Sequence, residues 1–229
     1  MSRGTWRELP QTKIEVESVA TVLEKSKIAA SVIEGADGTE ESFKALSGKR
    51  TSIIHLATHG FFLTDDEIRN KKYFRNVAIN DRNFKDGQFD TSMKRSGLIF
   101  SGGQNAWLGK DIPDNVEDGI LLAEEIPSID LRGTDLLVLS ACNTGLGDIS
   151  SEGVYGLQRG FKQAGVKTIL MSLWPVDDKA TQMLMDQFYR HLTAGQSKTE
   201  ALRNAQSYLR SNGFSNSKYW ASFIMLDGM

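Results

Sequence analysis

The predicted sheet is centred on Asp135-Leu136-Leu137-Val138-Leu139-Ser140-Ala141-Cys142-Asn143-Thr144-Gly145-Leu146-Gly147. This sequence opens with an apolar run that is too short for a typical helix and that predicts a β-strand buried on both faces. It ends in small residues and two glycines, which favour a sharp turn. Open α/β sheets bind ligands just beyond the carboxyl ends of their strands. Cys142, the single cysteine of the chain, therefore stands where chemistry usually occurs.

A second sequence has the same form. Thr51-Ser52-Ile53-Ile54-His55-Leu56-Ala57 predicts another buried strand, and Thr58-His59-Gly60 predicts the turn that follows it. If the two strands are parallel neighbours, Cys142 and His59 face each other across one crevice. A histidine can make a thiol nucleophilic near neutral pH, and the unshielded N–H of Gly60 can stabilise an oxyanion. The alternative is that Cys142 is a buried small apolar residue, which is the commoner role of a lone cysteine.

The composition describes an ordinary globular protein. The 229 residues are 40% apolar and 24% charged, which suits one large domain with a sizeable core. The formal net charge of −2 predicts neither a nucleic-acid partner nor a membrane partner. One cysteine excludes an intramolecular disulfide, and no apolar run approaches the roughly 20 residues that span a bilayer. Without an apolar signal segment, we predict a cytoplasmic protein.

Helical and strand patterns alternate along most of the chain, which predicts one three-layer α-β-α domain over residues 1–229 with a mostly parallel sheet. Thr39 and Asp177 are the predicted N-caps of two of the helices. The predicted helices cover 10–27, 39–46, 152–165, 178–192 and 198–209, and the predicted strands cover 28–34, 51–57, 96–101, 135–141, 166–173 and 219–226.

Two parts of the chain depart from this alternation. Residues 61–95 are largely polar and show no compelling period, so we expect an active-site lid, a binding loop or a solvated surface insertion. Residues 119–126 favour a short helix or ribbon.

Several nucleotide, phosphate and metal motifs do not fit the sequence. Position 148, where a phosphatase loop starting at Cys142 would need arginine, is aspartate and would repel phosphate. His55, His59 and Cys142 could supply three zinc ligands, but no fourth is evident. We therefore predict no metal and no cofactor.

Two blocks of the sequence resemble a known family. Residues 54–60 and 137–147 are similar to the two signature blocks of CHAT domains, which are caspase-like cysteine peptidases often fused to TPR repeats. The resemblance covers nearly the whole chain in the expected order and is weakest at about 64–95. It continues through residues 13–17, 152–157, 172–178, 201–206 and 220–223.

The resemblance implies a caspase-hemoglobinase fold and a cysteine endopeptidase. Cys142 corresponds to the nucleophile and His59 to the catalytic histidine, with the N–H groups of Gly60 and Cys142 as oxyanion donors. His55 matches a frequent family position and is expected to support the site. Asn143 departs from the family, which commonly has Glu or another polar residue there.

Acidic residues near the predicted site would favour substrates with Lys or Arg before the cut. The candidates are Asp148, Glu152, Asp177 and Asp178, and Trp174 is a candidate wall of the pocket. Three of these residues also have a purely structural interpretation. Asp177 can be an N-cap, Glu152 can be a favourable charge in the first turn of a helix, and Trp174 can pack against the core.

The expected partners are a protein or peptide substrate and a TPR region or other regulatory partner. Neither nucleic acid nor a membrane is expected to bind directly. Because the chain begins at the family's first helix, we expect a fragment or a stand-alone catalytic domain. The alternative function is a latent or inactive caspase-like scaffold or binding module.

Overall fold

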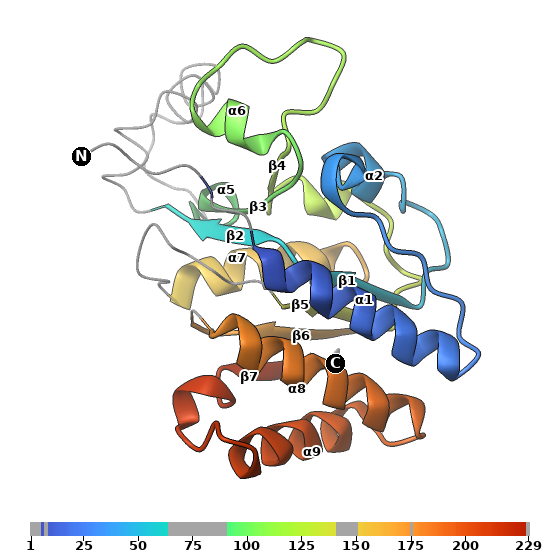
Figure 1. The fold of residues 1–229 in the computed structure, drawn as a ribbon. Coiled ribbons are helices and arrows are strands. Elements are labelled where there is room, and N and C mark those ends of the chain that lie inside the picture. Colours follow the sequence, from blue (N-terminus) through green and yellow to red (C-terminus); the bar gives the residue numbers. More distant parts are fainter. Residues whose placement is uncertain (1–5, 7–8, 64–90, 141–150, 175, 228–229) are drawn as a thin grey trace.

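A computed structural model of the chain describes residues 6, 9–63, 91–140, 151–174 and 176–227 (Figure 1). The larger of its two sheets has the strand order β1-β5-β6-β7. β1 (Ile53–Leu56), β5 (Leu136–Leu139) and β6 (Thr168–Ser172) are parallel, and β7 (Phe223–Asp227) is antiparallel to β6. The predicted mixed α/β class with a mostly parallel sheet is therefore confirmed.

The central strand β5 is buried on both faces, as its continuous apolar run predicts. Leu136 and Val138 belong to one apolar core, whereas Leu137 and Leu139 belong to the other, and none of the four is more than 2% exposed. Successive strand side chains point to opposite faces, so a run of four apolar residues supplies both cores.

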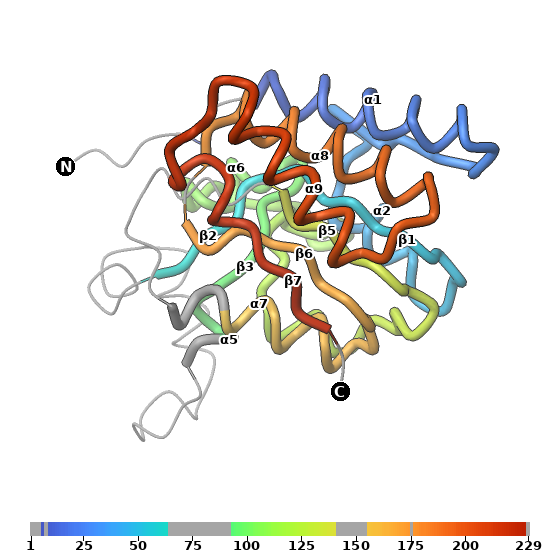
Figure 2. Tube along the Cα trace, turned by 90° about the horizontal axis from the view of Figure 1, so that it is seen from below, coloured from blue at the N-terminus to red at the C-terminus, as the bar shows by residue number. Residues whose placement is uncertain are grey.

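Helices cover both faces of this sheet (Figure 2). α1 (Pro10–Lys25), α8 (Asp178–Thr193) and α9 (Lys198–Ser211) share the core of one face, and α7 (Ser151–Gln163) covers the other together with α2 (Glu40–Lys44). The predicted caps are confirmed, because Thr39 accepts from the Ser42 N–H and Asp177 accepts from the Ala180 N–H. Within the described ranges, no helix is both long enough and apolar enough to cross a bilayer.

A second, antiparallel sheet has the order β2-β3-β4, formed by His59–Phe62, Ser96–Ile99 and Ile120–Leu122. His59 and Gly60 were predicted to form a turn, and that prediction was wrong, because both belong to β2. The reason is that Phe61 and Phe62, which follow them, are buried in this sheet. β4 and a short 3₁₀ turn (Ile126–Ser128) occupy the segment for which a helix or ribbon was predicted.

Two further short helices flank the second sheet. α5 (Thr91–Arg95) leads into β3, and α6 (Gly103–Trp107) packs on β4. Gly103 and Gly119 let α6 approach the start of β4 closely, since a Cβ on Gly103 would lie 2.4 Å from the Gly119 carbonyl oxygen. Most of the segment expected to be a lid or insertion, residues 64–90, lies outside the described residues.

The predicted strand over residues 28–34 was wrong. That segment has no strand conformation, and Ile28, Val32 and Ile33 are between 40% and 52% exposed. β-branched residues favour a strand only where a neighbouring strand and a core are available, and Ala30 alone in this segment packs against a core. Whether residues 1–229 fold as one domain stays a prediction.

Candidate active site

The two strands that lead to His59 and Cys142 are parallel neighbours, as the proposed crevice requires. β1 pairs with β5, with His55 opposite Val138 and Leu56 opposite Leu139. The chain therefore leaves both strands at the same edge of the sheet, and His59 follows three residues after Leu56. Cys142 follows three residues after Leu139 but lies outside the described residues.

His59 begins β2 and is half-buried. Its ring lies against the indole of Trp6, with 4.9 Å between ring centroids. The amino-terminal end of α8 is also close, because the charge of His59 influences the carboxyl of Asp178. Partial burial raises the pKa of Asp178, the negative charges of Asp177 and Glu15 raise it further, and His59 acts in the opposite direction.

The strand register determines where the Gly60 N–H points. Gly60 lies opposite Leu98, and residue pairs in an antiparallel ladder alternate between hydrogen-bonded and non-hydrogen-bonded. The Leu63 N–H donates to the Arg95 carbonyl at 2.8 Å, so these two residues form a hydrogen-bonded pair. Because such pairs recur at every second residue, His59 and Ile99 are also a hydrogen-bonded pair, whereas Gly60 and Leu98 are not. The Gly60 N–H is therefore directed away from β3, toward the edge of β2 that pairs with no other described strand.

His55 is at the centre of a buried polar network. Its Nε2 lies 2.8 Å from Glu15 Oε1 of α1 and 3.2 Å from Ser140 Oγ, just beyond β5. Its Nδ1 lies 3.0 Å from the Tyr189 hydroxyl of α8. Burial, and to a lesser extent the charge of Glu15, raise the pKa of Tyr189. The phenol therefore keeps its proton and donates a hydrogen bond to Nδ1. We accordingly assign the ring proton of His55 to Nε2, which faces Glu15.

This network is unsuited to nucleophilic catalysis by Ser140. A serine triad needs the hydroxyl and the carboxylate on different ring nitrogens, whereas Ser140 and Glu15 share Nε2. The Ser140 side chain is also inaccessible, since the residue is only 2% exposed. The network instead connects α1, β1, α8 and the end of β5, two residues before Cys142.

The residues predicted to bind substrate are only partly described. Trp174 is 36% exposed, and its indole N–H donates to the Lys218 carbonyl at 3.1 Å. The Asp177 carboxylate accepts from the Ala180 N–H at 2.9 Å, so its capping role is observed. Asp178 is exposed at the start of α8, and the charge of His59 acts to lower its pKa. Asp148 and the side chain of Glu152 lie outside the described residues.

Sequence reasoning missed Glu15 and Trp6. On the apolar face of a helix over 10–27, Ile14 would be expected to be buried, but it is 48% exposed, whereas Glu15 is 3% exposed. The spacing contained the signal, because Glu15 precedes the buried Val19 by four residues and so lies on the same face. Trp6 comes before the first predicted helix, and a tryptophan in a polar segment is a signal that it packs against another part of the chain.

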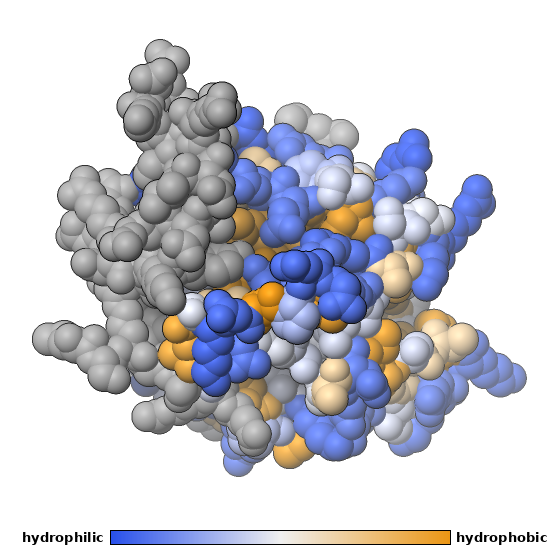
Figure 3. Space-filling view, turned by 90° about the horizontal axis from the view of Figure 1, so that it is seen from above, coloured by the Kyte–Doolittle hydropathy of each residue, from blue (hydrophilic) through white to orange (hydrophobic). Residues whose placement is uncertain are grey.

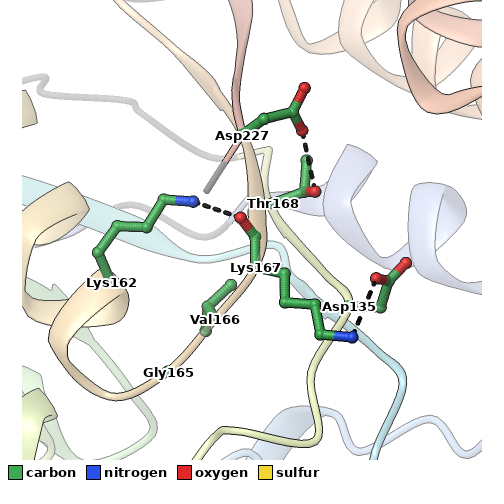
Figure 4. A pocket seen from close by; sticks show the side chains of 7 residues that line it. All are labelled: Asp135, Lys162, Gly165, Val166, Lys167, Thr168 and Asp227. Atoms are coloured by element: carbon green, nitrogen blue, oxygen red, sulfur yellow. Dashed lines mark hydrogen bonds and ion pairs between the residues drawn. The ribbon is translucent and has the colours of Figure 1, made fainter. Parts of the chain in front are cut away.

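A surface hollow lies at the opposite end of the sheet (Figure 4). It is formed where β5 and β6 begin and β7 ends, and the carboxylate of Asp135 in its wall is paired within the protein: Lys198 and Lys167 contact Asp135 at 2.7 Å and 3.8 Å. Thr168 donates to Asp227 at 3.0 Å. Ligands of parallel sheets bind at the other end, so this hollow is not the candidate site. Within the described residues, no cluster of three His, Cys, Asp or Glu side chains is arranged to hold a metal.

Comparisons with known proteins agree with the resemblance in the sequence. A family model described as CHAT domain matches residues 1–228. The chain is 26% identical over 227 residues to tetratricopeptide repeat protein 28 of Homo sapiens and 32% identical over 228 residues to the protein of that name from Mus musculus. The matches cover 99% of this chain and 9% of each relative. The chain thus spans a small part of the length of these repeat proteins.

Proposed function

The chain belongs to the CHAT domain family, and from this premise we propose that it is a cysteine endopeptidase that cleaves protein substrates with a Cys142–His59 dyad. The observation that carries the proposal is the register of β1 and β5. Leu56 and Leu139 are paired, so the strands that lead toward His59 and Cys142 end side by side at one edge of the sheet. Parallel sheets of this kind bind their ligands at that edge.

In the proposed reaction, the Cys142 thiolate attacks the carbonyl carbon of the scissile peptide bond. The Gly60 and Cys142 N–H groups stabilise the resulting oxyanion. His59, as the imidazolium, donates a proton to the leaving amine nitrogen as the C–N bond breaks and a thioester forms. The imidazole then accepts a proton from water, which attacks the thioester, releases the carboxylic acid product and regenerates the thiolate. The direction of the Gly60 N–H, away from β3, supports its part in this mechanism.

We propose that His55 supports the site through its buried contacts rather than by chemistry. Its Nε2 lies between Glu15 and Ser140, so α1 and the residue two positions before Cys142 are held by one imidazole. A side chain this buried does not exchange protons with substrate, but it can keep the end of β5 in register with β1.

The proposed substrate preference is for a basic residue before the cut, recognised by acidic groups among Asp148, Glu152, Asp177 and Asp178, with Trp174 as a wall of the pocket. Asp178 is the favoured member of this group, because it is exposed and lies within the electrostatic influence of His59. Asp177 is less favoured, since its carboxylate already caps α8.

A second candidate is a latent or inactive scaffold controlled by a TPR region or another partner. It is favoured by the names of the relatives, which describe repeat proteins and not peptidases. A docking module would present a continuous apolar surface. Among the coloured residues of the face seen in Figure 3, apolar side chains are scattered among hydrophilic ones and form no such continuous surface.

The test is covalent labelling of Cys142 by peptidyl acyloxymethyl ketones that end in Lys, Arg or Asp, with the adduct located by mass spectrometry. We expect selective labelling by the basic probes, its loss in Cys142→Ala, and a fall of about 100-fold or more in His59→Ala. His191→Ala is the matched control, because it removes a histidine from the last turn of α8 and should label at the wild-type rate.

Two results would contradict the peptidase proposal. Equal labelling of His59→Ala and His191→Ala would exclude a catalytic role for His59 and so exclude the dyad. An absence of labelling by every peptidyl probe, with slow alkylation by iodoacetamide as well, would mean an inactive thiol and would favour the scaffold.

A further inference from the structure

His59 of the proposed dyad lies beside a cluster of aromatic side chains, one of which precedes the first helix. Trp6 precedes α1, and its indole contacts the ring of His59 at 4.9 Å between centroids, with an interplanar angle of 38°. Trp6 also packs against Trp107 of α6, with 4.8 Å between the ring centroids. Trp107 in turn packs edge-on against Phe61 of β2 at 5.1 Å. These distances lie in the range of favourable aromatic pairs.

Trp6 is held in this position by its backbone as well as by its ring. Its N–H donates to Gln104 Oε1 at 2.6 Å, and Gln104 is in α6. α6 is fixed against the start of β4 by the close approach of Gly103 and Gly119. Trp6 is therefore attached to the same helix through a hydrogen bond and through contact with Trp107.

An indole in this position limits the conformations of the imidazole. A half-buried histidine side chain can rotate about two torsions, and a general acid must point its proton at the leaving group to be effective. The ring face of tryptophan also attracts an imidazolium within about 6 Å, which is the form of His59 that the proposed reaction needs before the amine leaves.

We infer that Trp6 is a positioning residue for His59 and so belongs to the working active site. This inference rests on the proposed function. It goes beyond that function because it adds a residue from outside the two signature blocks. It also means that a displacement of Trp6 would change the reactivity of the site without altering either dyad residue.

The test compares Trp6→Leu and Trp6→Phe with Tyr208→Leu in the full chain. Tyr208 is an aromatic residue that is 39% exposed on α9, so its loss should leave labelling unchanged. For Trp6→Leu we expect the maximal labelling rate at saturating peptidyl ketone to fall about 10–100-fold, with a small change in the half-saturating concentration. Trp6→Phe keeps an aromatic ring and should restore most of the rate.

A second readout does not depend on activity. The imidazole Hε1 resonance of His59 experiences the ring current of the adjacent indole, so it should shift in Trp6→Leu while that of His191 does not. Measured in Cys142→Ala, this resonance reports the contact in a chain that cannot react.

The outcomes separate this inference from the peptidase proposal. A Trp6→Leu variant that labels as fast as wild type, or faster, would overturn the positioning role, and a faster rate would make Trp6 a cover over the site. An unchanged His59 resonance would overturn the contact itself. If the wild-type chain is not labelled at all while the resonance does shift, the peptidase proposal fails, the Trp6–His59 contact stands, and the positioning role falls with the reaction.

Discussion

At the scale of single residues, the most consequential feature is a carboxylate inside the protein. Glu15 is 3% exposed and faces His55 at 2.8 Å, in a network that also includes Ser140 and Tyr189. Removing one partner of a buried polar pair leaves the other without compensation for its lost hydration. The network therefore adds a buried polar contact to the apolar packing of α1 on the sheet.

We predict that Glu15→Ala lowers the free energy of unfolding by about 3 kcal/mol, measured by urea denaturation. Glu15→Gln should lose much less, because its amide oxygen still accepts from His55 Nε2. Glu17→Ala is the matched control on the same helix, since Glu17 is 56% exposed and its contact with Lys13, at 3.7 Å, is a surface ion pair. Equal losses in Glu15→Ala and Glu17→Ala would show that the buried network contributes nothing.

At the scale of elements, the amino-terminal end of α8 combines a capping residue with an acidic residue whose carboxyl is under the electrostatic influence of His59. Asp177 has extended backbone conformation and accepts from the Ala180 N–H at 2.9 Å, while Asp178 is the first residue of the helix. The two neighbouring carboxylates therefore have separable roles: Asp177 in the stability of α8 and Asp178 in charge near His59.

We predict that Asp177→Ala destabilises the protein by about 1 kcal/mol, and that Asp177→Asn stays close to wild type, because asparagine is also a good N-cap. The labelling preference for basic probes should persist in Asp177→Asn and weaken in Asp178→Asn. The opposite pattern, with preference lost in Asp177→Asn alone, would move substrate recognition to the capping residue.

At the scale of the whole molecule, one buried carboxyl ties stability to pH. Glu40 is 1% exposed, contacts Lys44 at 2.7 Å and accepts from the Gly119 N–H at 3.0 Å. Burial raises the pKa of Glu40 to about 7; Lys44 opposes that rise, and the charges of Glu125 and Asp118 add to it. The folded protein therefore binds the Glu40 proton more tightly than the unfolded chain does.

The sign of the effect follows from this difference. The contribution of Glu40 to stability is fully present below its unfolded pKa and is lost as the pH rises through its folded pKa. We predict that the difference in unfolding free energy between wild type and Glu40→Gln changes by roughly 2 kcal/mol from about pH 5 to about pH 8, to the disadvantage of wild type at the higher pH.

The control for this experiment is Glu41→Gln. Backbone hydrogen bonds lower the pKa of Glu41, so its effect on stability has the opposite sign. A pH profile of Glu40→Gln that runs parallel to wild type would mean that Glu40 titrates in the folded protein as it does in the unfolded chain.

Local sequence alone was sufficient for several elements. The apolar run of β5 requires burial on both faces, and Thr39 and Asp177 satisfy the first N–H groups of their helices, so these features depend on neighbours within a few residues. The resemblance to CHAT domains was likewise contained in short motifs, and the family match supports it.

The tertiary structure decided what depends on distant partners. The segment 28–34 has strand-forming residues but pairs with none of the strands that the structure describes, whereas His59 and Gly60, predicted to form a turn, pair with β3 as part of β2. Glu15 contacts His55 across 40 positions of sequence, and Trp6 contacts Trp107, with β1, β2 and β3 between them in the sequence. Local pattern reports what a residue prefers, but only the packed chain determines which buried group lies opposite it.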